Sequence, residues 1–385
     1  MRFADNRNKI GKYIPAVVFL IFIYGMALWF IFSPKPDYSS SEKRYLQKFP
    51  EVTAEKLLSG EFGSEFETFF ADRFPQRNTW VGLNAYTALA EGNNGASGVY
   101  NCKNGYLINK PVSTENNLDK NIGAVADFAK SIDTPTTVML VPSTGYIVDD
   151  VLPTFHDKYN DDEDISKISS TLSKDKIGFV DLRERFKSEY KNGSQLYYKT
   201  DHHWTTKGAY TGYQELCKAL GVTPIDDSTL KKDSYPDFYG TTYSSSGFWL
   251  TQPDNIDIWN NPKNSDRNIS VKITEGANIK TSGSMYFTDH LKEDDKYPVF
   301  IDGNHALTEI TNSNAKNGTI ILIKDSFSHS LAPFLAENYS KVVLVDLRYY
   351  KESVSDLVTT YNPEQVVVLY GIDNLATDTD IVWLK

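Results

Sequence analysis

The stretch that decides the fold is GTIILIKDSFSHSLAPFL, residues 318–335. The apolar run from Thr319 to Ile323 predicts a buried strand, and the segment from Ser326 to Asn338 predicts a helix. Ser326 therefore follows the carboxyl end of a strand, the edge where open α/β sheets bind ligands. The N–H groups of a helix N-terminus can also stabilise a developing oxyanion. Serine is equally a favoured N-cap, so this junction alone favours a structural role.

Strands and helices alternate on both sides of this junction. We expect strands at 136–141, 177–182, 342–346 and 365–370, and helices at 115–131, 162–174, 205–220 and 351–359. Such alternation is typical of βαβ units and predicts an α/β fold with a mainly parallel sheet. Residues 225–316 are rich in Ser, Asp, Asn and Tyr, and we interpret them as an irregular or β-rich insertion, with β-like pieces at 247–250 and 298–301.

The N-terminal region predicts a membrane anchor. Residues 14–32 contain no charged side chain over 19 positions, about the length that spans a bilayer core. Basic residues precede the run and an acidic region follows it, which places the N-terminus in the cytoplasm. A cleaved signal peptide is the alternative, but residues 30–34 (FIFSP) lack a small-x-small cleavage site.

We therefore expect a cytoplasmic tail at 1–13, a transmembrane anchor at 14–32, a linker at 33–43 and an extracytoplasmic domain at 44–385. Within that domain, residues 44–80 predict helix that stops at Pro75, and 96–108 predict a hairpin with an Asn-Gly turn.

Charge and cysteine content exclude several classes of function. Residues 1–34 carry four basic side chains and one acidic one, whereas the remainder carries 36 basic and 49 acidic ones, a net charge of −13. An acidic outer domain argues against nucleic acid as a partner. The two cysteines, Cys102 and Cys217, are too few for a disulfide framework; they either pair or are both buried as small apolar residues.

The block Asp201-His202-His203-Trp204 immediately precedes a predicted helix. A serine nucleophile needs a base, and the base needs an acceptor that orients it. We favour His203 as the base, with His202 structural and Trp204 packed. Asp-His-His is also a possible metal site, but no third clustered ligand is visible in the sequence. We expect neither a metal nor another cofactor.

The block and its setting, KTDHHWTTKGA at residues 199–209, resemble the DHHW protein family. That family is similar to the SGNH-like proteins of alginate and cell-wall polysaccharide O-acetylation. The resemblance implies an SGNH-hydrolase-like three-layer fold in which Asp201 is the acid, His203 the base and Ser326 the nucleophile. The Asp/His block precedes the serine, which is similar to the circularly permuted motif order of the alginate proteins.

One position departs from the pattern of the resembled enzymes. The segment VVVLYGIDN, residues 366–374, is similar to their strand leading to Gly-x-Asn-Asp, so their oxyanion Asn falls on Asp373. An anionic Asp would repel an oxyanion. Asn374 or backbone N–H groups such as that of Phe327 are the remaining candidate donors; otherwise activity is reduced or lost.

The resemblance implies O-acyl transfer, with acetyl as the expected acyl group, onto a cell-envelope polysaccharide through a Ser-His-Asp acyl-enzyme. It also implies a multi-pass membrane acyltransferase as the partner that exports the acyl group. The alternatives are an extracytoplasmic carbohydrate esterase with the same site, and a catalytically inactive glycan-binding or scaffold protein of an acetylation complex.

Overall fold

The computed structural model describes residues 2–112 and 117–384. The chain divides into two compact units, one that extends to Thr87 and one that begins at Ala88. The extracytoplasmic domain predicted at 44–385 therefore includes the second unit and those residues of the first unit that follow the linker. The first residues of the helix predicted from 115 lie outside the described residues.

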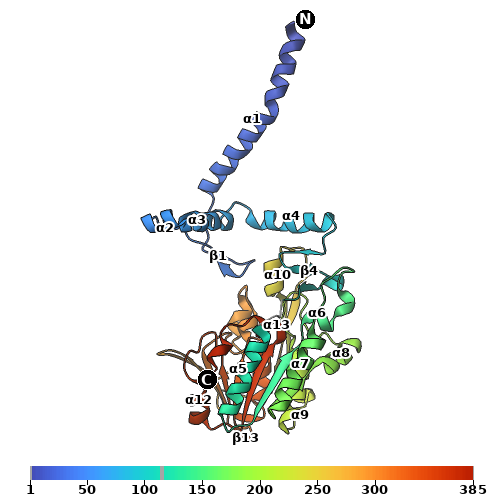
Figure 1. The fold of residues 1–385 in the computed structure, drawn as a ribbon, viewed down its shortest axis with the longest axis vertical. Coiled ribbons are helices and arrows are strands. Elements are labelled where there is room, and N and C mark those ends of the chain that lie inside the picture. Colours follow the sequence, from blue (N-terminus) through green and yellow to red (C-terminus); the bar gives the residue numbers. More distant parts are fainter. Residues whose placement is uncertain (1, 113–116, 385) are drawn as a thin grey trace. The chain divides into compact units, whose positions relative to one another are not determined.

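The first unit begins with the long helix α1 (Arg2–Phe32) (Figure 1). Within it, Tyr13–Phe32 is long and apolar enough to cross a membrane, as judged by length and composition, and it is the one such segment among the described residues. The rest of the unit consists of a short antiparallel pair and three helices: β1 (Tyr38–Ser39), β2 (Arg44–Tyr45), α2 (Ala54–Ser59), α3 (Glu61–Asp72) and α4 (Arg77–Ala90), which continues into the second unit.

Helix in this unit begins later than predicted and is interrupted twice. Residues 46–53 are not helical, Gly60 adopts a left-handed conformation (φ 82°) between α2 and α3, and Pro75 separates α3 from α4. At the end of α3, Arg73 donates from Nη1 to the carbonyls of Lys35 and Pro36, each over 2.8 Å. These contacts fold the linker back onto the helices of the same unit.

The second unit contains an eight-stranded sheet in the order β11-β10-β12-β14-β13-β15-β6-β7. The five strands from β14 to β7 are parallel to one another, and β12, β10 and β11 extend the sheet as antiparallel strands. Their bounds are β6 (Thr136–Val141), β7 (Gly178–Asp181), β10 (Ile269–Glu275), β11 (Asn278–Ser282), β12 (Leu307–Asn312), β13 (Asn317–Lys324), β14 (Tyr339–Val345) and β15 (Gln365–Gly371).

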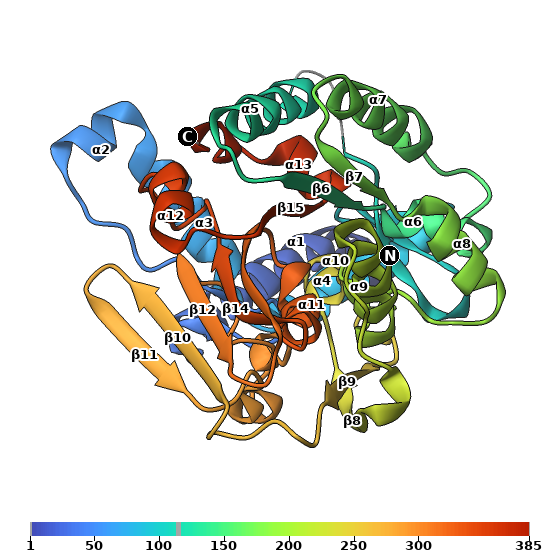
Figure 2. The same ribbon diagram turned by 90° about the horizontal axis from the view of Figure 1, so that it is seen from below.

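Helices cover both faces of this sheet, which gives the three layers of the expected α/β fold (Figure 2). One face packs against α5 (Asn117–Ser131), α7 (Asp161–Lys174), α12 (Val354–Tyr361) and α13 (Ile372–Thr377). The other packs against α6 (Thr144–Ile147), α8 (Arg183–Lys191), α9 (Thr206–Leu220) and α11 (Ser328–Leu335). Alternate side chains of β13 enter the two cores: Ile320 and Leu322 enter one, and Ile321 and Ile323 the other.

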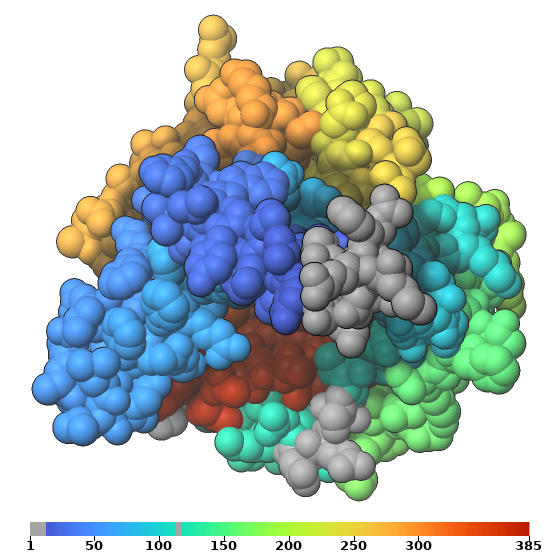
Figure 3. All heavy atoms as spheres, turned by 90° about the horizontal axis from the view of Figure 1, so that it is seen from above, coloured from blue at the N-terminus to red at the C-terminus, as the bar shows by residue number. Residues whose placement is uncertain are grey.

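The predicted insertion is β-rich, as expected, but three of its five strands belong to the main sheet. Beyond β10, β11 and β12 it contains a separate hairpin of β8 (Lys231–Phe238) and β9 (Asp254–Asn260), and helix α10 (Thr241–Ser246). The β-like piece expected at 247–250 is wrong, since it is a loop. The piece expected at 298–301 overlaps the 3₁₀ turn Tyr297–Val299, and Phe300 forms an isolated antiparallel bridge with Tyr286. In the space-filling view these yellow to orange residues lie together along one side of the unit (Figure 3).

The remaining elements are short. The predicted hairpin at 96–108 is a three-stranded sheet of β3 (Gly95–Ala96), β4 (Val99–Asn101) and β5 (Leu107–Asn109). The other 3₁₀ turns are Lys103–Gly105, Asp149–Val151, Asp227–Thr229, Thr288–Lys292 and Ile381–Trp383. Cys102 and Cys217 are both buried and free.

Candidate active site

Ser326 lies in the turn between β13 and α11, at the carboxyl edge of the parallel strands. The helix begins at Ser328, two residues later than predicted, so Ser326 is not its N-cap. The Ser326 side chain is buried, and its Oγ lies 2.7 Å from Nε2 of His203, which is 123 residues away in the sequence. This contact gives the hydroxyl an acceptor for its proton.

Asp201 holds the other side of the same imidazole. Its Oδ1 lies 2.5 Å from Nδ1 of His203 and accepts the backbone N–H of that residue over 2.8 Å. Its Oδ2 accepts the backbone N–H of Thr241 over 2.6 Å. Burial alone raises the pKa of Asp201, but the two neighbouring imidazoles and their hydrogen bonds outweigh it and hold the pKa well below its usual range. An ionised Asp201 fixes the tautomer in which Nε2 of His203 accepts a proton.

The local fold places these residues without help from regular secondary structure. Tyr197 and Trp204 form an antiparallel bridge that closes the loop between them, and Tyr198 N–H donates to the His203 carbonyl over 3.2 Å. Immediately afterwards Thr205 caps α9 by accepting the Gly208 N–H over 3.1 Å. The Asp-x-His segment is thus a short loop fixed at both ends.

The other members of the block contact the site differently. Trp204 is fully buried, and its Nε1 donates to the Phe327 carbonyl over 3.0 Å and to Ser330 Oγ over 2.9 Å, which ties the His203 loop to α11. His202 is half-buried, and its Nδ1 lies 2.6 Å from Thr241 Oγ1. Burial and the charge of His203 lower the pKa of His202 to about 4, so this imidazole is neutral near pH 7.

Tyr297 is a site residue that the sequence did not indicate. Its ring stacks on that of His203, with centroids 4.0 Å apart and an interplanar angle of 11°, and its hydroxyl donates to the Ser326 carbonyl over 3.2 Å. It comes from the insertion, immediately before the piece expected to be β-like at 298–301. No motif or periodicity in the sequence around Tyr297 and Pro298 predicts this contact.

Both candidate oxyanion donors are bound to one buried carboxylate. Phe327 N–H donates to Asp325 Oδ1 over 2.9 Å, and Asn374 Nδ2 donates to Asp325 Oδ2 over 2.7 Å. Gly371 N–H donates to the same Oδ2 over 2.8 Å. By contrast, the backbone N–H of Ser326 has no hydrogen-bond acceptor among the described residues. In this arrangement the Ser326 N–H and the second N–H of the Asn374 side-chain amide remain open for an oxyanion.

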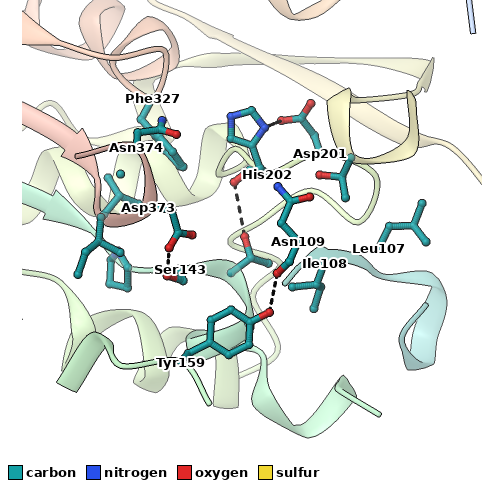
Figure 4. Close-up of a pocket in the computed structure, with 17 residues that line it drawn as sticks. Leu107, Ile108, Asn109, Ser143, Tyr159, Asp201, His202, Phe327, Asp373 and Asn374 are labelled. Atoms are coloured by element: carbon teal, nitrogen blue, oxygen red, sulfur yellow. Dashed lines mark hydrogen bonds and ion pairs between the residues drawn. The ribbon is translucent and has the colours of Figure 1, made fainter. Parts of the chain in front are cut away.

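Asp373, the residue at the position of the oxyanion Asn, does not contact Asp325. Its Oδ1 accepts the Ser143 hydroxyl over 3.0 Å. Asp373 and Ser143 both line a cleft whose lining also includes His202 and Phe327, the sequence neighbours of His203 and Ser326 (Figure 4). The cleft is bordered by the ends of β5, β6 and β15 and by the block itself; its lining includes Asn109, Tyr159, Asp201, His202, Phe327 and Asn374.

The side chains of Asp201, His202 and His203 also form the one grouping in the described part of the chain that has the composition of a metal site, with donor atoms within 4.8 Å of one another. Both ring nitrogens of His203 already contact protein groups, Asp201 on one side and Ser326 on the other. A metal ligated by His203 would have to displace one of those two partners.

Comparison with known proteins agrees with this fold. Residues 88–345 match the family described as DHHW protein. Among solved structures, a DHHW family protein from Eubacterium siraeum is 18% identical, with a TM-score of 0.63 over 75% of this chain and 95% of that one. Bacillus cereus PatB1, solved with a sulfonyl adduct, is 21% identical, with a TM-score of 0.63 over 74% of this chain and 97% of that one.

A weaker likeness, with a TM-score of 0.48 and 14% identity, is to the O-acetyltransferase domain of Pseudomonas putida AlgJ, and it covers 75% of this chain and 95% of that one. No curated protein sequence matches the chain. At these identities the structural likenesses concern the fold. The family match covers well over half of the sequence and contains the Asp201 to Ser326 constellation, and the chain therefore belongs to the DHHW protein family.

Proposed function

We propose that this protein transfers an acyl group, with acetyl as the leading candidate, to a hydroxyl of a cell-envelope polysaccharide through an acyl-enzyme on Ser326. The observation that carries the proposal is the continuous hydrogen-bonded chain from Asp201 through His203 to Ser326. It has the order of acceptor, base and nucleophile that serine catalysis requires.

In the first half-reaction His203 Nε2 takes the Ser326 proton as Oγ attacks the acyl carbonyl. The tetrahedral intermediate collapses, the donor's leaving group takes the proton from His203, and the acyl group remains on Oγ. In the second half-reaction a sugar hydroxyl gives its proton to His203 and attacks the acyl-enzyme; the bond between the acyl carbon and Ser326 Oγ then breaks, and Oγ takes the proton back from His203. The open Ser326 N–H is our candidate for the oxyanion donor in both steps.

The location of the reaction is part of the proposal. The apolar segment Tyr13–Phe32 would anchor the chain with its basic N-terminus in the cytoplasm and its catalytic unit outside. Acyl coenzymes are cytoplasmic, so the acyl group must cross the membrane first. A multi-pass acyltransferase is the class of partner that would deliver it, and this chain itself would need no cofactor.

A second candidate is an inactive glycan-binding or scaffold protein. The observation that favours it is that Asp325 binds the Phe327 N–H and one of the two Asn374 side-chain N–H groups, which leaves fewer donors open for an oxyanion. Loss of one oxyanion donor costs about 10²–10³ in rate. The two candidates therefore differ in whether Ser326 forms an acyl-enzyme at all.

The test uses the full-length chain in detergent, treated with p-nitrophenyl acetate or with a sulfonyl fluoride and analysed by intact and peptide mass spectrometry. We expect acylation and sulfonylation at Ser326, both lowered at least about 10³-fold in Ser326→Ala and His203→Ala. Ser328→Ala is the matched control, since the Ser328 hydroxyl is buried and has no hydrogen-bond partner among the described residues.

An unmodified wild-type protein would favour the scaffold. If the acyl-enzyme forms, the acceptor decides the class of enzyme: addition of polysaccharide oligomers should yield acylated sugar faster than free acid. A product that is free acid alone would identify an esterase instead.

A further inference from the structure

Ser143, in the wall of the cleft, lies between two carboxyl groups. It follows β6, and its hydroxyl donates to Asp373 Oδ1 over 3.0 Å. Its backbone N–H donates to Asp161 Oδ1 over 2.7 Å. Asp161 is buried at the start of α7, whereas Asp373 is half-buried and faces the cleft (Figure 4). The two acids therefore meet at one residue, and only Asp373 is accessible to a ligand.

No basic group compensates this pair in the described part of the chain. Neither Asp161 nor Asp373 forms an ion pair with a described Lys or Arg, and the described residues that line the cleft include no Lys or Arg. The charges that act on the two carboxyls are those of acids, Asp164 on Asp373 and Asp373 on Asp161. Asp373 in the wall of the cleft and the buried Asp161 behind it therefore repel each other, and no described Lys or Arg lines the cleft.

The pKa values reflect this environment. Burial raises the pKa of Asp373 to about 6, although the Ser143 hydrogen bond opposes the shift. Burial likewise raises the pKa of Asp161 to about 7, against the Ser143 N–H. A buried carboxylate without a cation is unfavourable. It is relieved either by a proton or by a positively charged ligand, and at neutral pH the accessible Asp373 is mostly ionised.

The other charged groups that line the cleft do not meet the need for a cation. Asp201 is an anion bound to His203 and Thr241, and His202 is neutral. A positive charge that pairs with the ionised Asp373 would therefore come from a ligand. Since the same cleft is lined by His202 and Phe327, neighbours of the proposed base and nucleophile, a ligand bound at Asp373 lies within the substrate region.

We propose that the cleft binds a primary ammonium group of the substrate against the carboxylate of Asp373. This inference rests on the proposed function and narrows its substrate class. The ammonium group is bound and does not react. It belongs either to the acyl group, as in an aminoacyl ester, or to the acceptor, as in a glycan with unacetylated amino sugars.

The acyl arm compares two esters of nearly equal size, p-nitrophenyl alaninate and p-nitrophenyl propionate, on the full-length chain in detergent. The ratio of their acylation rate constants should fall about tenfold in Asp373→Asn, the effect of losing one charge pair of about 1.4 kcal/mol. The matched control is Asp289→Asn, a side chain on the surface turn Thr288–Lys292, which should leave the ratio unchanged.

The acceptor arm measures binding and needs no catalysis. Isothermal titration with a glucosamine tetramer and an N-acetylglucosamine tetramer is carried out on Ser326→Ala protein with and without Asp373→Asn. We expect the glucosamine tetramer to bind at least about tenfold more tightly, and this preference to be lost with Asp373→Asn. Ethylammonium chloride should compete in the protein with Asp373 intact, whereas sodium chloride at equal ionic strength should not.

The outcomes distinguish failure of the ammonium site from failure of the proposed acyl transfer. Unchanged preferences in both arms, with no competition by ethylammonium, overturn the ammonium site. A preference in one arm alone identifies the source of the ammonium group. Selective binding without any acyl-enzyme leaves the ammonium site in place and contradicts the proposed transfer. The ethylammonium competition keeps the test valid if Asp373→Asn fails to fold.

Discussion

The backbone of Gly240 packs directly against the carboxylate of Asp201. A Cβ added at Gly240 would overlap both the Cβ and the Oδ2 of Asp201, so only glycine allows this approach. The next residue, Thr241, donates its N–H to the same Oδ2 over 2.6 Å. The insertion thus supplies the support that orients the acid of the proposed triad.

Gly240→Ala should therefore impair catalysis without removing any reacting group. Displacement of Asp201 misaligns His203, and we expect the acylation rate of Ser326 to fall about 10–100-fold, since small errors of position are costly in catalysis. The measurement is the single-turnover rate with p-nitrophenyl acetate. Gly123→Ala is the control because a Cβ there meets nothing within 4 Å. A Gly240→Ala protein as fast as the wild type would contradict the orienting role of Asp201.

Asp325→Asn should destabilise the protein and also slow acylation. The Asp325 carboxylate accepts three N–H donors, from Phe327, Gly371 and Asn374, and an amide oxygen with an NH₂ beside it cannot accept all three. An unsatisfied buried donor costs about 1–3 kcal/mol. Urea unfolding followed by near-UV circular dichroism measures the loss, and the acylation rate is measured in parallel. Gain of activity would instead mean that Asp325 withholds these donors from the oxyanion.

Local sequence patterns predicted the parts of the structure that depend on local physics. The apolar run at 136–141 is β6 to the residue, and the helix predicted at 205–220 is α9, with Thr205 and Gly221 as its caps. The pairing of His203 with Ser326 was accessible through residue type and motif order. The roles of Tyr297 and Gly240 could not be predicted. Both depend on tertiary contacts of the insertion, whose sequence has no hydrophobic periodicity, and sequence alone does not distinguish a glycine that packs closely against another residue from other glycines.

Protonation of Asp161 should make stability depend on pH. Its pKa is raised by burial from 3.8 to about 7, so the native state binds this proton more tightly than the unfolded state. The free energy of unfolding should therefore fall by about 2–4 kcal/mol from this group as pH rises from 4 to 7. Asp161→Asn should remove that part of the decline, since an amide oxygen still accepts the Ser143 N–H.

Urea unfolding at several pH values between 4 and 8 measures this difference. The control is Asp119→Asn, an exposed side chain on α5, which should leave the profile unchanged. If the free energy of unfolding varies with pH in the same way in the wild type and in Asp161→Asn, then Asp161 has the same pKa in the folded and unfolded states and the prediction is wrong.

The last prediction concerns Lys324, the charged residue at the end of β13, two positions before Ser326. Lys324 is fully buried, and its Nζ lies 2.8 Å from both Asp346 Oδ2 and His329 Nε2. Arg348 also binds Asp346, with Nη2 2.6 Å from Oδ2. Lys324→Met would leave Asp346 with one cation and His329 with no partner, because its Nδ1 already has none among the described residues.

We expect Lys324→Met to lower the free energy of unfolding by about 2–4 kcal/mol, near the lower end of the cost of breaking a buried pair, because Arg348 still offsets the Asp346 charge. Lys272→Met is the matched control: Lys272 is half-exposed, and its partner Glu309 keeps Lys341 as a second cation, so we expect a loss of less than about 1 kcal/mol. Equal losses in the two variants would mean that burial adds nothing to the Lys324 pair. A loss confined to Lys324→Met, with slower acylation at Ser326, would show that this buried ion network holds the end of β13 and with it the nucleophile.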